Sequence, residues 1–316
     1  MNHDNRHVVF VPGMNPKPPP AEHRRLLWRC IEGGAAQAGV TAEPLAPLGA
    51  HFHLAAWNYI YYGHYADIEL DRPWVEHMLR GDGERYCAPE SSRRTVLRTR
   101  LMYTLGDLLP VLARLFGDAD ILARIADTER YFRNRNSIGV RVRAAIKQTL
   151  APLAERNAEI MLVGHSLGSV LAYDTLWELS RRDGWRWRCP LFLTLGSPLG
   201  MFYIQRRLLG RREHGARRYP DNIGRWINIS ASGDVIATDR RIANDFERMR
   251  RLGLVDSIED VAAGVHTCYG TAEGPAPHRC FGYFFHPRVA GLIAGWLCGQ
   301  EPLTVRIPAL DDTSVS

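Results

Sequence analysis

The fold is decided at residues 159–176, which read EIMLVGHSLGSVLAYDTL. An apolar run from Ile160 to Val163 precedes the pentapeptide GHSLG, and a helix-period run from Leu167 to Arg181 follows it. This order predicts a buried strand, a tight turn centred on Ser166 and a helix. A serine in a Gly-x-Ser-x-Gly turn between strand and helix has an exposed hydroxyl on a strained backbone, which is typical of a catalytic nucleophile. We therefore predict that Ser166 is a nucleophile.

Further strands and helices alternate along the chain on both sides of this turn. The other predicted strands are His7 to Val11, Phe52 to Trp57, Leu191 to Leu195 and Arg225 to Ser230. The other predicted helices outside residues 63–136 are Glu22 to Gln37, Val140 to Asn157 and Pro287 to Leu297. Such alternation favours an α/β fold with a mostly parallel central sheet covered by helices on both faces.

Residues 63–136 differ from the rest because they carry helix periodicity without clear strand signals. The predicted helices are Pro73 to Arg80, Thr95 to Phe116 and Ala119 to Arg133. We expect residues 1–62 and 137–316 to form the core and residues 63–136 to form a helical, lid-like insertion. The apolar part of the insertion, Leu101 to Phe116, is compatible with a surface that contacts lipid or with a helix packed on the core.

Composition limits the function classes. The chain has 316 residues, 46% of them hydrophobic, and a formal net charge of +6. Lysine occurs only at Lys17 and Lys147, so arginine carries nearly all the positive charge. Because acidic residues are interspersed and no nucleic-acid motif accompanies the arginines, we expect a solvated surface and no nucleic-acid partner, with peripheral contact to anionic lipid left open.

The sequence also bears on the compartment. There is no signal-peptide pattern at the N-terminus and no run of about 18 apolar residues. The six cysteines are scattered without the close pairs typical of metal sites. We interpret them as reduced thiols of a cytoplasmic protein.

Four motifs carry a resemblance to a known family: VFVPGM at residues 9–14, GHSLG at 164–168, LGSPL at 195–199, and Gly233-Asp234. On these motifs the chain resembles the α/β-hydrolase superfamily, in particular its lipase- and esterase-like members. The resemblance covers the first strand and most of residues 159–297. It implies an oxyanion hole made by the N–H groups of Leu167 and of the turn after the first strand, where Met14 matches. It also implies that an N-terminal part of the usual sheet is missing, and that no metal or cofactor is needed.

The superfamily order of nucleophile, acid and histidine directs the search for the other two residues. Asp234 follows the predicted strand Arg225 to Ser230 and is the expected acid, with Asp239 and Asp256 as rivals.

The base is a choice among three histidines. His278 lies in a loop rich in proline and glycine before the last predicted helix and is followed by aromatic residues, so it is the preferred candidate. His286 stands next to Pro287 and is compatible with a capping role, and His266 is the remaining alternative. His165, inside the turn, is expected to be a structural neighbour.

These features together predict a serine hydrolase that cleaves a carboxylic ester through an acyl-enzyme. The substrate would be a small-molecule or lipid-like acyl ester. An acyltransferase or a thioesterase would use the same residues, and a non-catalytic interaction module on the same fold is a further alternative. The sequence leaves the oligomeric state open.

Overall fold

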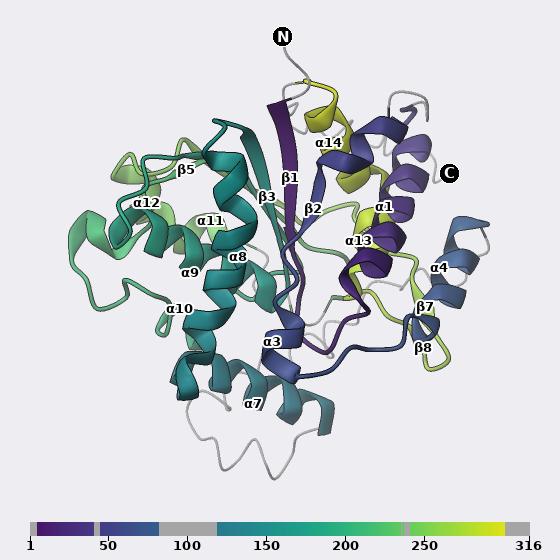
Figure 1. Cartoon of the computed structure of the whole chain (residues 1–316), viewed down its shortest axis with the longest axis horizontal. Helices are drawn as coiled ribbons and strands as arrows, with labels where there is room; N and C mark the ends of the chain where they lie inside the picture. Colours follow the sequence, from purple (N-terminus) through teal and green to yellow (C-terminus); the bar gives the residue numbers. More distant parts are fainter. Residues whose placement is uncertain (1–4, 41–44, 82–118, 235, 237–240, 301–316) are drawn as a thin grey trace, which may run out of the picture.

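The computed structural model of the chain describes residues 5–40, 45–81, 119–234, 236 and 241–300, and the side chains of these except residues 119–125. It has an α/β architecture in which a six-stranded parallel sheet is covered by helices on both faces (Figure 1). The described elements are, in chain order, β1 (Arg6–Val11), α1 (Pro20–Gln37), η2 (Ala46–His51), β2 (Phe52–Leu54), α3 (Asn58–Tyr62), η3 (Ile68–Leu70), α4 (Arg72–Leu79), α7 (Ala119–Arg133), η5 (Arg135–Ser137), α8 (Ile138–Ala154), β3 (Glu159–His165), α9 (Leu167–Arg181), β4 (Cys189–Leu195), α10 (Phe202–Gln205), η6 (Gly215–Arg218), β5 (Ile223–Ile229), α11 (Ile242–Asp245), α12 (Glu247–Arg251), β6 (Ser257–Val261), β7 (Gly270–Thr271), β8 (Gly274–Pro275), α13 (Cys280–Phe285) and α14 (Pro287–Leu297).

The strand order β2-β1-β3-β4-β5-β6 contains one reversal of direction. Strand β2 pairs with one edge of β1, and the chain then returns so that β3 pairs with the other edge of β1. In the pairing of β1 with β3, Val8 lies opposite Met161. At such a switch point the loops at the carboxyl ends of the two strands diverge and leave a crevice, where α/β proteins bind their ligands. Ser166 follows β3 and Gly13 follows β1, so both predicted site segments lie at this position.

Strand β1 shows why the sheet needs helices on both faces, since all six of its residues are buried. Val8 and Phe10 pack in the apolar cluster that includes residues of α1, α13 and α14. Val9 and Val11 point the other way, into the cluster of α8 and α9. Burial of such a side chain contributes about 1.5–3 kcal/mol. A continuous apolar run is therefore the expected sequence of a central parallel strand.

Most predicted elements are confirmed. Helices α9 and α14 have the predicted bounds, and the strands match within a few residues. The strand expected over Phe52 to Trp57 ends earlier, at Leu54, because Trp57 turns into α3 and its indole N–H donates to the Pro12 carbonyl at 2.8 Å. Strand β6 and helix α13 were not predicted.

The described ends of the expected insertion are helical. Helices α4 and α7 agree with the predicted helices 73–80 and 119–133. Val75 and Met78 of α4 pack in the α1 cluster, whereas Tyr131 of α7 packs in the α8–α9 cluster. The predicted helix Thr95 to Phe116 lies outside the described residues.

The cysteines correct one expectation. Cys268 is disulfide-bonded, while Cys30, Cys189, Cys280 and Cys298 are free. The prediction that all six are reduced is therefore wrong for Cys268, and the thiol argument for a cytoplasmic location is lost with it. Within the described ranges, no helix combines the length and the apolar character needed to cross a membrane.

Candidate active site

The turn after β3 holds Ser166 in an unusual backbone conformation. Its φ is 53° and its ψ is −131°, although it is not a glycine, and its N–H donates to the Leu195 carbonyl at 3.0 Å. The turn is so tight that it requires a glycine at position 164, since a β-carbon there would lie 2.5 Å from the Cα atom of Ser169. Strained backbone of this kind persists only where the surroundings impose it, and it concentrates at functional sites. The side chain of Ser166 is thereby presented at the carboxyl end of the sheet.

His278 and Asp234 meet this serine in a line. The Oγ atom of Ser166 lies 2.9 Å from Nε2 of His278. The other ring nitrogen, Nδ1, lies 2.9 Å from both carboxylate oxygens of Asp234. A carboxylate only accepts, so Nδ1 carries a proton, and in the neutral ring Nε2 is then the acceptor for the serine hydroxyl. The structure thus brings the three preferred residues together, although 112 positions separate Ser166 from His278.

Asp234 is buried and held by several donors. Tyr283 donates its hydroxyl to Oδ2 at 2.6 Å, and the Ile236 N–H donates to Oδ1 at 2.9 Å. The hydroxyl of Tyr283 in turn accepts from the Ala231 N–H at 2.9 Å. Burial by itself raises the pKa of Asp234, but the charge of His278 and the hydrogen bonds from His278, Tyr283 and Ile236 outweigh it and lower this pKa to about 2. The carboxylate is therefore ionised at neutral pH.

Gly196, in the LGSPL motif, lets the acid approach. Its φ is +54°, and a β-carbon there would lie 2.6 Å from Oδ2 of Asp234 and 3.2 Å from Nδ1 of His278. Only glycine meets both the backbone conformation and the close contact. This explains why a glycine follows β4 beside the predicted acid.

His165 supports the loop that carries the histidine. Its Nε2 lies 2.8 Å from the His278 carbonyl, which can only accept, so Nε2 carries the proton. Burial, and then the charge of His278, hold the pKa of His165 well below its usual range. His165 is thus a neutral neighbour that fixes the His278 backbone, as expected from the sequence.

The turn after β1 lies against the serine on its other side. A β-carbon on Gly13 would lie 2.9 Å from the β-carbon of Ser166. Asn58 of α3 fixes the turn, because its Nδ2 donates to the carbonyls of Gly13 at 2.8 Å and of Asn15 at 2.9 Å. Within the described residues, the N–H groups of Met14 and Leu167 donate to no protein acceptor. Both are available beside Ser166 to a negatively charged oxygen.

A cavity of about 360 Å³ opens above Ser166 and His278. Its walls are both polar and apolar, and they are formed by Gly13, Met14, Asn15, Lys17, His23, Asp71, His165, Gly233, Pro275, Ala276, Pro277, Arg279, Cys280 and Phe281. His23 is 1% exposed, and neither of its ring nitrogens has a hydrogen-bond partner among the residues that the structure describes. Among the described residues, no group of three or more His, Cys, Asp or Glu could hold a metal ion.

The rival candidates lie elsewhere or make other contacts. His286 is the N-cap of α14, where its Nδ1 accepts from the Arg288 N–H at 3.2 Å. The side chain of His266 is exposed. Asp256 forms an exposed ion pair with Arg188 at 2.6 Å. Asp239 lies outside the described residues.

The sequence did not predict the contact of Tyr283 with Asp234. The only signal for this contact in the sequence is the aromatic run after His278, and that run does not indicate a role for the hydroxyl of Tyr283. Compared with models of protein families, with curated proteins and with solved structures, the chain matches none. The α/β fold and the geometry around Ser166 are therefore the basis for a functional assignment.

Proposed function

We propose that the protein is a serine hydrolase of the α/β-hydrolase type, which cleaves a carboxylic ester through an acyl-enzyme. The observation that carries the proposal is the hydrogen-bonded line from Ser166 Oγ through the His278 ring to Asp234, with distances of 2.9 Å at both ends. A serine hydroxyl is a weak nucleophile until a positioned base takes its proton, and this line supplies the base and the group that orients it.

Each residue has a role in the proposed reaction. His278 Nε2 takes the proton of Ser166 as Oγ attacks the acyl carbonyl, and the N–H groups of Met14 and Leu167 hold the oxyanion. The alcohol leaves with the proton from His278. Water then attacks the acyl-enzyme as His278 takes its proton, and His278 returns this proton to Ser166 Oγ as the carboxylic acid leaves. Asp234 remains ionised throughout and stabilises the imidazolium that forms twice.

The backbone supports these roles. Leu167 is the first residue of α9, so its N–H lies at the positive end of the helix dipole, where a developing oxyanion is favoured. Removal of one oxyanion-hole donor typically slows the chemical step by about 10²–10³-fold. The position of Ser166 at the switch point of the sheet also favours a ligand site there.

A fluorophosphonate probe, which labels activated serines, tests the proposal. We expect the wild-type protein and Ser180→Ala to be labelled, and Ser166→Ala to be unlabelled. Ser180 is a matched control because it lies at the far end of the same helix. Absence of labelling in the wild type, or labelling that survives Ser166→Ala, would contradict the proposal.

The choice of base is tested with paired histidine variants. His278→Ala should abolish the hydrolysis of p-nitrophenyl esters, whereas His286→Ala should retain it. The reverse pattern would assign the base to His286. A series of acyl-chain lengths in the same assay defines the substrate, and added alcohols measure transfer against hydrolysis.

A further inference from the structure

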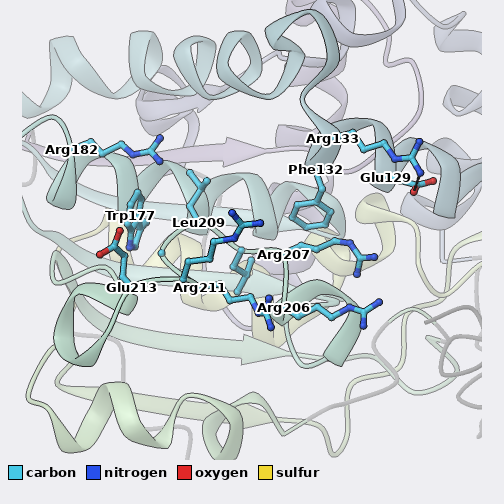
Figure 2. Close-up of a pocket in the computed structure, with 13 residues that line it drawn as sticks. Glu129, Phe132, Arg133, Trp177, Arg182, Arg206, Arg207, Leu209, Arg211 and Glu213 are labelled. Carbon is cyan, nitrogen blue, oxygen red and sulfur yellow. Dashed lines mark ion pairs between the residues drawn. The ribbon is translucent and has the colours of Figure 1, made fainter. Parts of the chain in front are cut away.

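A second cavity lies at the opposite end of α9 from Ser166. Its volume is about 520 Å³, and none of its lining residues lines the cavity above Ser166. It is formed by Glu129, Phe132 and Arg133 of α7, Trp177 of α9, Arg182 after it, and residues 206–213 after α10. Figure 2 shows arginine side chains around Trp177, Leu209 and Phe132.

The walls of this arginine pocket carry a large surplus of positive charge. They include six arginines, Arg133, Arg182, Arg206, Arg207, Arg211 and Arg212, and only two acidic residues. Both acidic residues have partners: Glu129 pairs with Arg133 at 2.5 Å, and Glu213 with Arg217, outside the lining, at 3.6 Å. The formal surplus is four positive charges within one concavity.

Two of these arginines are not neutralised by any residue that the structure describes. In the described part of the chain, the guanidinium groups of Arg211 and Arg212 form no ion pair or hydrogen bond, and both residues are exposed. The guanidinium of Arg182, by contrast, pairs with Glu178 at 3.3 Å and lies 4.9 Å from the centre of the Trp177 ring. Like charges gathered in this way repel one another, and an anionic ligand relieves that repulsion.

The segment that carries the arginines is fixed to the protein core. The Leu209 N–H donates to Oδ1 of Asp174 at 2.8 Å, and Asp174 is 1% exposed. The other oxygen of Asp174 accepts from the Tyr131 hydroxyl at 2.7 Å. The arginines therefore project from a backbone that is positioned before any ligand binds, which lowers the entropic cost of binding.

Gly210 shapes the floor of the pocket. Its φ is +78°, and a β-carbon there would collide with the indole nitrogen of Trp177 and lie 2.6 Å from the Arg218 carbonyl. The Trp177 N–H donates to the Arg217 carbonyl at 3.0 Å, so the ring cannot move aside without losing this bond. Glycine at this position lets the chain turn directly over the tryptophan, next to Arg211 and Arg212.

From this geometry we propose that the arginine pocket binds a polyanionic ligand with two or more phosphate groups. Planar guanidinium groups match phosphate oxygens two at a time, and several of them here face one concavity. The cavity volume of about 520 Å³ is that of a small-molecule site, which favours a phosphorylated small molecule or headgroup over a nucleic acid. The proposal does not depend on the chemistry at Ser166.

Titration calorimetry with inorganic triphosphate tests the proposal directly. We expect binding by the wild type and a loss of about tenfold or more in affinity for Arg211→Gln/Arg212→Gln. The matched control is Arg250→Gln/Arg251→Gln, which removes the same charge from exposed arginines of α12 outside the pocket. It should change the affinity by less than about twofold. Ser166→Ala should bind as the wild type does, which separates this test from that of the proposed function.

Flotation with vesicles distinguishes the two sources of phosphate. Binding to phosphatidylinositol-bisphosphate vesicles that triphosphate displaces, and that only the pocket variant loses, would identify a lipid headgroup. Triphosphate binding without vesicle binding would identify a soluble ligand. Equal losses in the pocket and control variants, or no binding of triphosphate or vesicles by the wild type, would overturn the proposal.

Discussion

Replacing Tyr283 with phenylalanine removes one hydroxyl that joins two buried groups behind His278. The hydroxyl donates to Asp234 at 2.6 Å and accepts from the Ala231 N–H at 2.9 Å. A hydrogen bond to a charged group contributes about 1.5–3 kcal/mol, and an unsatisfied buried N–H costs about 1–3 kcal/mol. We expect Tyr283→Phe to lower the free energy of unfolding by about 3 kcal/mol.

The effect of Tyr283→Phe on reactivity should be smaller than that of losing the acid. Loss of one donor raises the pKa of Asp234 from about 2 but leaves it well below 7, so the carboxylate stays ionised and keeps the His278 tautomer. Labelling of Ser166 by a fluorophosphonate should slow by about tenfold, against about 10⁴-fold for Asp234→Asn.

Urea denaturation and labelling rates at 25 °C measure the two effects separately. Tyr131→Phe is the matched control, because it removes a hydroxyl–carboxylate bond of 2.7 Å to Asp174 on the opposite face of the sheet. It should lose comparable stability with an unchanged labelling rate. If Tyr283→Phe loses less than about 1 kcal/mol, or labels as slowly as Asp234→Asn, the reasoning about this hydrogen bond is refuted.

Three further predictions follow from buried groups. Burial lowers the pKa of His23 to about 3, whereas the unfolded chain takes up this proton below about pH 6.5. His23 alone should therefore lower the free energy of unfolding by about 2 kcal/mol between pH 6.5 and pH 5, so in urea titrations His23→Leu should lose about that much less than the wild type. Arg143→Met should lower the free energy of unfolding by about 3 kcal/mol, because the buried charge of Glu178 loses its buried ion-pair partner. The double variant Arg143→Met/Glu178→Met removes that charge and should recover part of the loss. Gly168→Ala should reduce both the melting temperature and the rate at which Ser166 is labelled, since the new β-carbon would collide with the carbonyl oxygens of Val11 and Pro12. An unchanged labelling rate would contradict the close approach of the turn after β1 to α9.

The parts of the fold that the sequence predicted are those fixed by local pattern. Continuous apolar runs predicted the central strands, and helix periodicity predicted α9 and α14. Strand β6 was missed because it is a short edge strand with Glu259 and Asp260 and only half-buried side chains, a pattern that resembles a surface loop. Helix α13 was missed because six residues are too few for a helix to be stable without tertiary packing. Five of the six are buried, so the helix depends on contacts with the rest of the protein.

The same distinction applies to the site. Ser166 was predictable because its turn is encoded by adjacent residues. That His278, and not His266 or His286, lies beside Ser166 depends on contacts that no motif specifies: the Thr267 hydroxyl donates to the Pro277 carbonyl at 2.9 Å, and His165, 113 positions away, lies 2.8 Å from the His278 carbonyl. Spacing along the chain does not encode such contacts.

Helix α9 relates the two proposed sites through the opposite charges at its ends. Its first N–H, that of Leu167, lies at the positive end of the dipole, where the oxyanion would form. Trp177 and Arg182 lie at the negative end, where positive side chains are favoured, so the helix offsets part of the cost of gathering arginines there. Ser166 and Trp177 are 11 residues apart, or about 16 Å of helix, which is twice the screening length of about 8 Å at physiological salt. Interactions between exposed charges are largely screened over such a distance, so an anion bound by Arg211 and Arg212 should leave the labelling rate of Ser166 unchanged.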